Sequence, residues 1–411
     1  MLNFIETKSR YPEEVSASEL MYACQYGKIR RVKKLIKKGF NTYFEAGIAL
    51  MYASMAGHDE VVKVLLENGA NINNRALFFA SVNGHSSTVE ILLKHGADVH
   101  AKGEESLKNA SEQGYVEIVE ILLKYGADIH AKNDEALRRA VLYNHIEVVK
   151  ILIEAGANIH FDDEHLLRTA SKYGYTQIVD LLLENGADVH AKGEESLKNA
   201  SEQGYVEIVE ILLKYGADIH AKNDEALRRA VLYNHIEVVK ILIEAGANIH
   251  FDDEHLLRTA SKYGYPQIVA LLLENGADVH AKGEESLKNA SESGNTETVR
   301  LLIKYGADVH TCDDLPLRRA SSEGYVETVR VLIINGADVN ALYDEAIKSA
   351  AHNGHEDVVE LLILNGSNVE ADNDYALKTA IFNKHAKVIE VLCKMWYKRQ
   401  YDSEGKLNGK L

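Results

Sequence analysis

Small and apolar residues recur along this chain with a fixed period. Alanine occupies the same place in thirteen successive segments: Ala23, Ala53, Ala80, Ala110, Ala140, Ala170, Ala200, Ala230, Ala260, Ala290, Ala320, Ala350 and Ala380. All but one of the steps are 30 residues long, and the step from Ala53 to Ala80 is 27. A period of this size predicts a solenoid, in which each unit buries its apolar face against its neighbours.

Residues 101–130 show the pattern within one unit. Leu107 and Ala110 are spaced i, i+3, which predicts one face of a first short helix. Gly114 is expected to end that helix, because glycine adopts the left-handed conformation that a tight turn requires. The apolar stripe of a second helix follows at i, i+1, i+4 and i+5: Ile118, Val119, Leu122 and Leu123. Gly126 ends the second helix, so the chain is predicted to be an all-α solenoid of about 13 helix-turn-helix units.

The repeat organises the chain into one array and two ends. Residues 18–393 form the array, because no Pro/Gly/Ser-rich linker interrupts them and the 411-residue chain has only three prolines. Residues 1–17 are expected to form an N-terminal cap, and residues 394–411 a C-terminal cap and basic tail. The residues expected to cover the two ends are Phe4, Ile5 and Tyr11 at the first and Trp396 at the last.

Charge and cysteine content narrow the class of protein. The formal net charge of −16 argues against binding to nucleic acid or to anionic membrane surfaces. Cys24, Cys312 and Cys393 lie in distant repeats, which fits packing residues in a reducing compartment. The N-terminus lacks the features of a signal peptide, and no apolar run reaches 18 residues. We therefore expect a soluble, cytoplasmic, monomeric protein.

Several short motifs of the unit resemble the ankyrin repeat. They are Leu-x-x-Ala, Gly followed by Tyr or His, Val-x-x-Leu-Leu and Gly-Ala-Asp-Val-His, and they recur through residues 18–393. The resemblance implies an ankyrin solenoid that binds another protein without catalysing a reaction.

Two departures from the family pattern stand out. The units run 30 residues, whereas the family period is 33. The Thr-Pro-Leu-His motif of the family is replaced by sequences such as Glu-Ser-Leu-Lys, so the projecting β-hairpin is expected to be stunted. This short, proline-poor form is similar to the ankyrin arrays of giant viruses of amoebae (mimivirus-like).

Charged residues accompany the first helix of each unit. Ten successive units carry an acid followed four residues later by Lys or Arg, from Glu104 and Lys108 to Asp374 and Lys378. Acid and base at this spacing are expected to pair and to cap the helix in place of the lost motif. The alternative, a functional basic groove, is disfavoured because the paired acids would cancel its charge.

Histidine recurs at the turn between units. Eight histidines share the 30-residue period: His100, His130, His160, His190, His220, His250, His280 and His310. Neighbouring units are too far apart to share a metal ion, so we interpret these residues as hydrogen-bonding turn residues. Their protonation near pH 6 is expected to soften the array. A second set is interpreted as structural: His58, His85, His145, His235, His355 and His385.

The sequence predicts no catalytic, cofactor-binding or metal-binding residues, so no cofactor is expected and the chain is not predicted to be an enzyme. The best binding signal lies just before the first turn of each unit, at positions that vary in the family and face its concave surface. The candidate partner-binding residues there are Tyr26, Tyr143, Tyr173, Tyr233 and Tyr263. Tyrosine offers a large contact area at low entropic cost, although these rings could instead pack on a neighbouring helix.

Three units have been duplicated together. Residues 101–190 and 191–280 differ only at Thr176/Pro266 and Asp180/Ala270. Either the partner carries a repeated epitope with a spacing of about 30 Å, or the copy lengthens a spacer.

Two functions remain open at this stage. The first is a scaffold that binds a host or viral protein through its concave face. The second is a substrate adaptor for a host ubiquitin ligase, since some viral ankyrin arrays carry a C-terminal F-box. Only 18 residues follow position 393, which disfavours the second function.

Overall fold

The computed structural model describes residues 12–38 and 45–395 of the chain, with side chains from residue 18 onward. The end-covering residues Phe4, Ile5, Tyr11 and Trp396 lie outside the described residues. Every regular element in the described part is a helix, and no strand occurs there, which confirms the all-α class and the paired helices of about thirteen units.

The first helix of each unit carries an odd number. These odd helices are α1 (Pro12–Gln25), α3 (Glu45–Met55), α5 (Asn74–Val82), α7 (Glu105–Gln113), α9 (Ala131–Leu142), α11 (His165–Tyr173), α13 (Glu195–Gln203), α15 (Ala221–Leu232), α17 (His255–Tyr263), α19 (Ala281–Glu292), α21 (Thr311–Glu323), α23 (Ala341–Asn353) and α25 (Ala371–Phe382).

The second helix of each unit carries an even number. These even helices are α2 (Ile29–Lys37), α4 (Asp59–Glu67), α6 (Ser86–Lys94), α8 (Val116–Lys124), α10 (Ile146–Glu154), α12 (Thr176–Glu184), α14 (Val206–Lys214), α16 (Ile236–Glu244), α18 (Pro266–Glu274), α20 (Thr296–Lys304), α22 (Val326–Ile334) and α24 (Glu356–Leu364). Residues 386–395 are also helical and follow α25.

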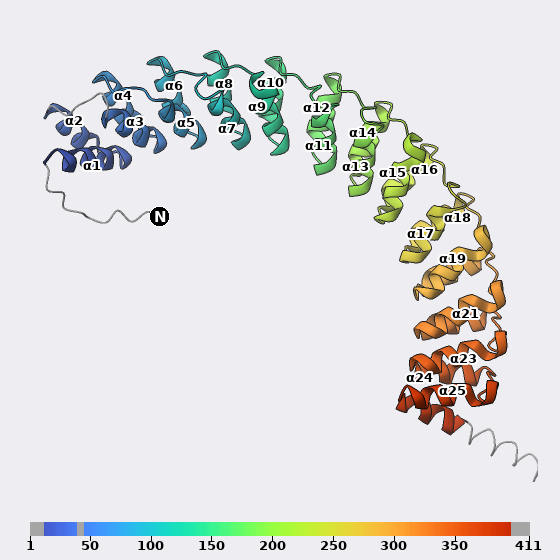
Figure 1. Ribbon diagram of the computed structural model, residues 1–411. Helices are drawn as coiled ribbons and strands as arrows, with labels where there is room; N and C mark the ends of the chain where they lie inside the picture. Colours follow the sequence, from blue (N-terminus) through green and yellow to red (C-terminus); the bar gives the residue numbers. More distant parts are fainter. Residues whose placement is uncertain (1–11, 39–44, 396–411) are drawn as a thin grey trace, which may run out of the picture. The chain divides into compact units, whose positions relative to one another are not determined.

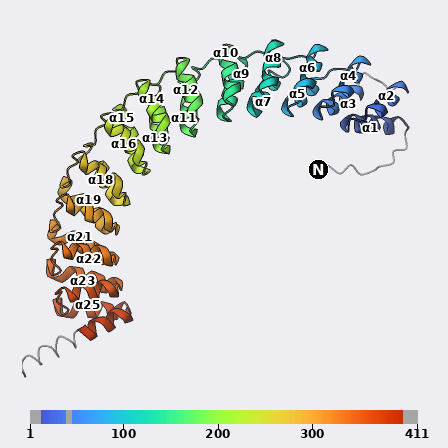
Figure 2. The same cartoon turned by 180° about the vertical axis from the view of Figure 1, so that it is seen from behind.

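The helices form two compact units, Met1–Ser196 with Lys214–Ala217, and Leu197–Leu213 with Asp218–Leu411. Within each of these two compact units, which contain several repeats each, the odd helices contact one another in one layer. The even helices contact one another in a second layer (Figures 1 and 2). Each odd helix also packs on the even helix that follows it. The core of each unit therefore lies between the two layers.

The period-30 alanines lie in that core. All thirteen are at most 1% exposed, and the leucine or isoleucine three residues before them is buried with them in most repeats. A small side chain at this position lets successive odd helices approach closely, since packed interiors leave no room for a larger one. The sequence prediction for the stripe of α8 is confirmed for Ile118, Val119 and Leu122.

A histidine ring at the start of several even helices links neighbouring repeats. His145 donates from Nε2 to the carbonyl oxygen of Glu112 in the preceding repeat at 2.9 Å. The same bond occurs for the other histidines of this set: His58, His85, His235, His355 and His385. Their structural role is confirmed, because each satisfies a carbonyl that the preceding odd helix leaves free at its end.

The link between repeats is a left-handed turn. In ten successive turns, beginning at Lys102–Glu104 and ending at Asp372–Asp374, three consecutive residues have positive φ, between 47° and 65°. L-amino acids disfavour this region by about 1–2 kcal/mol per residue. The stunted hairpin of the sequence prediction is thus a left-handed turn in the described residues, and other contacts must hold its conformation.

Those contacts replace the predicted acid–base pairs, and the prediction of those pairs is wrong. The carboxylate of Asp134 is buried and accepts a bond from Nδ1 of His130, at 3.0 Å. It also accepts the backbone N–H of Asn158 in the next turn at 2.9 Å, and it does not cap the helix. Arg138 instead donates to the carbonyl oxygens of Lys132 and Asn133. The reason is geometric: the left-handed turn points the acid inward, away from the base four residues later.

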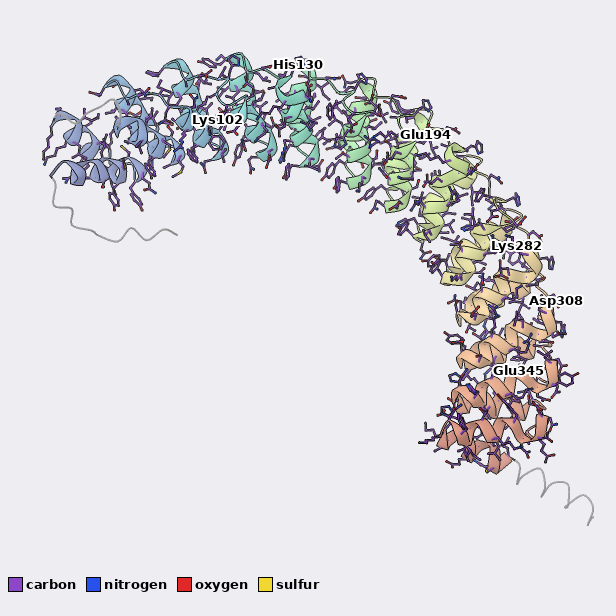
Figure 3. The ribbon with its side chains drawn as sticks, viewed as in Figure 1. Lys102, His130, Glu194, Lys282, Asp308 and Glu345 are labelled. Carbon is purple, nitrogen blue, oxygen red and sulfur yellow. The ribbon has the colours of Figure 1, made fainter. Side chains whose placement is uncertain are left out.

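The eight period-30 histidines all make this bond to a buried acid four residues later, at 2.5–3.1 Å. Figure 3 marks His130 and Glu194, which belong to two of these turns. Their interpretation as hydrogen-bonding turn residues is confirmed. The bond to Glu104 raises the pKa of His100, and the bond to Glu284 raises the pKa of His280. Protonation of these two histidines therefore stabilises the fold, and the predicted softening is wrong for them.

The cysteines divide into two kinds. Cys24 is buried, and burial raises the pKa of its thiol to about 12. Cys312 is exposed in a left-handed turn at φ 52°, so its interpretation as a packing residue is wrong. None of the helices in residues 12–38 and 45–395 is long and apolar enough to serve as a membrane span.

Candidate partner-binding face

The candidate tyrosines lie at the C-terminal ends of odd helices. Tyr143 and Tyr173 end the neighbouring helices α9 and α11, and Tyr233 and Tyr263 end α15 and α17. Each of these four side chains is about half exposed, between 48% and 52%. We call the surface formed by the exposed residues of α9 and α11, and of α15 and α17, the odd-helix face.

Tyr173 and Tyr263 are held in place by a second tyrosine. The ring of Tyr173 stacks on Tyr175 with centroids 5.9 Å apart, and the hydroxyl of Tyr175 donates to the carbonyl oxygen of Leu142 at 3.2 Å. Tyr263 stacks on Tyr265 in the same way, also at 5.9 Å. These two rings therefore have one supported side and one side that faces solvent.

Tyr26 is separate from the other four. It follows α1, packs at a tilt against Tyr22 with centroids 4.5 Å apart and an interplanar angle of 44°, and is 54% exposed. Three odd helices, α3, α5 and α7, stand between α1 and α9, and none of them ends in an exposed tyrosine. The sequence-predicted set is thus two adjacent pairs and one isolated residue.

A groove runs beside Tyr263 between α15, α17 and α19. Its volume is about 620 Å³. The lining residues with charged or hydrogen-bonding side chains include Arg228, Arg229, Arg258, Lys262, Thr259 and Asn289. Leu232 and Leu256 add apolar surface, and Glu285 is the only acid in the lining. An apolar surface with converging polar groups is typical of a recognition site.

The arginines of the groove are fixed by the turns beneath them. Arg228 donates from Nε and Nη2 to the carbonyl oxygens of Asn223 and Lys222, at 3.1 and 2.9 Å. Its guanidinium also lies 5.1 Å from the ring centre of Phe251. Arg258 donates in the same way to the carbonyl oxygens of Asp253 and Asp252, at 3.2 and 2.8 Å. The pattern of a lone base after the core leucine could have suggested this clamp, but only if the turn conformation had been foreseen.

His255 lies on the wall of the same groove. Burial lowers its pKa, and the positive charge of Arg258 lowers it further. His165 has the same shift from the same causes, with Arg168 as its basic neighbour. Burial is the larger cause of both shifts, and the nearby acids Asp162 and Asp252 oppose the effect of the arginines.

A second groove lies on the even helices. It has a volume of about 370 Å³ between α16 and α18, and Ala270 is part of its lining. Ala270 is one of the two positions at which the duplicated copies differ, with Asp180 at the equivalent place in α12. A negative side chain therefore occupies this position in one copy and is missing in the other. Within the described residues no group of three His, Cys, Asp or Glu side chains is arranged to hold a metal ion.

The comparisons with known proteins address the family directly. A family model described as "Ankyrin repeats (3 copies)" matches six overlapping stretches: residues 14–76, 77–163, 137–223, 166–253, 256–343 and 317–402. The chain is an ankyrin-repeat protein. Ankyrin repeats bind partner proteins, and the fold is typically a non-catalytic interaction module.

Among solved structures, the chain is similar to the human ASB11 ankyrin repeat domain at 29% sequence identity. The match covers 48% of this chain and 98% of that domain, with a TM-score of 0.42. A search of curated proteins finds no match. The family assignment therefore rests on the repeated match to the family model.

Proposed function

We propose that this ankyrin array is a non-catalytic scaffold that binds a partner protein through its odd-helix face. The observation that carries the proposal is the set of half-exposed tyrosines at the ends of adjacent helices, two of them supported by a stacked ring. Exposed aromatic side chains that are already held in one conformation lose little entropy on binding. Tyrosine is also enriched among the residues that dominate binding energy at interfaces.

The duplication supports the same surface. Tyr143 and Tyr173 in the first copy have identical counterparts, Tyr233 and Tyr263, in the second. The exposure of the counterparts is also nearly the same. The array thus offers the same aromatic pair twice, which suits a partner with a repeated epitope better than it suits a spacer.

The setting of the interaction is part of the proposal. We infer an intracellular, cytosolic protein that acts as a monomer on a host or viral protein, because the chain has free cysteines in widely separated repeats. The 30-residue, proline-poor units support an origin among the short-hairpin arrays of giant viruses.

Affinity purification with mass spectrometry tests the scaffold. The wild-type chain is compared with a variant in which Tyr143, Tyr173, Tyr233 and Tyr263 are replaced by Ala. A control variant replaces Tyr125, Tyr215 and Tyr305, which follow the even helices α8, α14 and α20. We expect a partner that is captured by the wild type and the control and lost from the odd-helix variant. Equal capture by all three chains would contradict the proposal, and cullin-ligase subunits among the captured proteins would support the adaptor role.

A further inference from the structure

The basic residues of the odd-helix face are not neutralised by the acids that the sequence places beside them. Asp224 and Glu254 are buried and bind His220 and His250. Arg228 and Arg258, four residues after those acids, donate mainly to backbone carbonyls, which carry no net charge. The expected pairing of each base with the acid four residues earlier, which argued against a basic groove, therefore does not occur at Arg228 and Arg258.

The lining of the groove is rich in cations. It contains Arg228, Arg229, Arg258 and Lys262 against one acid, Glu285. Two exposed acids, Asp252 and Asp253, lie in the turn just before α17 and offset part of this positive charge. On a chain with a net charge of −16, the excess of positive charge is thus local to the groove lining.

Several of these cations have bonding capacity left. A guanidinium has five N–H donors. The bonds of Arg228 and Arg258 use Nε and Nη2, which leaves Nη1 of each arginine for an acceptor in the groove. The ammonium group of Lys262 is exposed beside Tyr263 and has no ion-pair partner among the described residues. By contrast, Arg229 is already paired with Glu225 and Glu202.

The acids near the groove are themselves engaged. Asp252 lies 3.3 Å from Nη2 of Arg258 and 3.9 Å from Nζ of Lys282. Glu285 is paired with Lys288 at 3.0 Å. Asp252 therefore offsets part of the charge of Arg258, whereas Arg228 and Lys262 have no ion-pair partner among the described residues and leave the groove positive.

We propose that this groove binds an acidic segment of the partner protein, with Asp or Glu carboxylates on Arg228, Arg258 and Lys262 and an apolar side chain beside Tyr263. The inference rests on the proposed scaffold function and specifies the chemistry of its partner. Carboxylates match the charge and the donor geometry of guanidinium groups. The volume of about 620 Å³ accommodates a few side chains of an extended segment, not a folded surface.

The first copy carries the same side chains but lacks the same free donor. Arg138, Arg168, Lys172 and Tyr173 occupy the corresponding positions on α9 and α11. However, Nη1 of Arg168 already donates to Glu195 at 3.4 Å. We therefore expect the acidic segment to bind the groove beside Tyr263, with one segment per chain.

The test uses the full chain and the fluorescein-labelled peptide Glu-Asp-Glu-Phe-Glu-Asp-Glu, with Gln-Asn-Gln-Phe-Gln-Asn-Gln as the neutral control. Anisotropy titrations at low salt give the affinity, and calorimetry gives the number of peptides per chain. The variant Lys172→Glu/Lys262→Glu reverses one cation in each copy without touching an arginine that clamps a turn. The matched control, Lys150→Glu/Lys240→Glu, makes the same charge change in both copies on the even helices.

We expect one acidic peptide per chain, no binding of the neutral peptide, and affinity that falls as salt is raised. The groove variant should bind at least about tenfold more weakly, and the even-helix control within about twofold of the wild type. Equal loss in both variants, or no binding of the acidic peptide to the wild type, would overturn the inference. If the peptide fails while partner capture still depends on the tyrosines, only the acidic chemistry is wrong and the scaffold function stands.

Discussion

Contacts made by single residues hold each repeat against the next one. The ring of His145 lies across Gly114 and bonds to a carbonyl of the preceding repeat. A Cβ atom on Gly114 would come within 2.4 Å of this ring, so the glycine serves the contact as well as the turn. Gly126 also has positive φ, at 89°, but a Cβ atom there would meet nothing within 4 Å.

This difference predicts unequal costs for the same substitution. Gly126→Ala should cost only the left-handed penalty, about 1–2 kcal/mol of unfolding free energy. Gly114→Ala should cost more, because the His145 ring must also move and its bond of about 1 kcal/mol is lost. Urea unfolding of the two variants beside the wild type gives the comparison. Equal losses would mean that the ring contact contributes nothing.

Two histidines of the left-handed turns make stability depend on pH. His100 and His280 have a raised pKa in the folded chain, caused first by the hydrogen bond to Glu104 or Glu284. Their stabilisation is therefore fully present below the pKa of about 6.5 of an unfolded histidine, and it is lost as pH rises through the higher folded pKa. His165 and His255 act in the opposite direction, because burial lowers their pKa and their contribution is lost as pH falls.

Thermal melts at pH 6 and pH 8 separate these two effects. The variant His100→Gln/His280→Gln should lose stability relative to the wild type at pH 6 and much less at pH 8. The variant His165→Gln/His255→Gln should show the reverse preference, with a smaller loss at pH 6 than at pH 8. Parallel melting curves for the first variant and the wild type at both pH values would contradict the assigned role of the turn histidines.

At the level of elements, the left-handed turn is the feature that distinguishes this array. Its three strained residues are held by a buried acid and a histidine in eight of the ten turns, and by an arginine clamp in half of them. The sequence predicted the helices, since the spacing of Leu107, Ala110 and the α8 stripe follows a helical period. It could not predict the turn, because Lys, Asp and Leu occupy positive φ here without the glycine that usually marks that conformation.

The left-handed turn at the start of α23 carries the most strain of this kind on apolar side chains. Leu342 and Tyr343 have φ of 51° and 59°, and Tyr343 is 83% exposed. Tyr343→Gly should raise the unfolding free energy by about 1 kcal/mol, because glycine removes the steric penalty and little packing is lost. Asn133→Gly is the control, since asparagine tolerates this region and its gain should be smaller. Chemical denaturation measures both, and a loss of stability in Tyr343→Gly would show that the ring supports the turn.

For the molecule as a whole, repetition explains why the architecture could be predicted from the sequence and why the basic surface could not. The thirteen alanines and the ankyrin motifs predicted the architecture, because a solenoid depends on nearest-neighbour contacts that recur. The five candidate tyrosines were also found from their place in the unit. The basic surface was missed, because acid and base four residues apart were expected to pair, and the turn separates Asp134 from Arg138.

The duplication also places the proposed binding residues on a few of the odd helices. Among the described odd helices, the pairs α9 with α11 and α15 with α17 each carry Lys or Arg beside two exposed tyrosines. The remaining odd helices from α7 onward carry more acids than bases. A partner that contacts both the cations and the exposed tyrosines should therefore bind these four helices and leave the other odd helices uncovered.

Hydroxyl-radical footprinting of the full chain, with and without its captured partner, tests this account most directly. Oxidation of Tyr143, Tyr173, Tyr233 and Tyr263 is compared with that of Tyr125 and Tyr305, which follow even helices. Matching tyrosines in the two copies lie in nearly identical sequence and are evaluated together. We expect the partner to protect the four odd-helix tyrosines and to leave Tyr125 and Tyr305 unchanged. Protection of the even-helix tyrosines alone, with the four candidates still oxidised, would place the interface on the other layer and contradict the account.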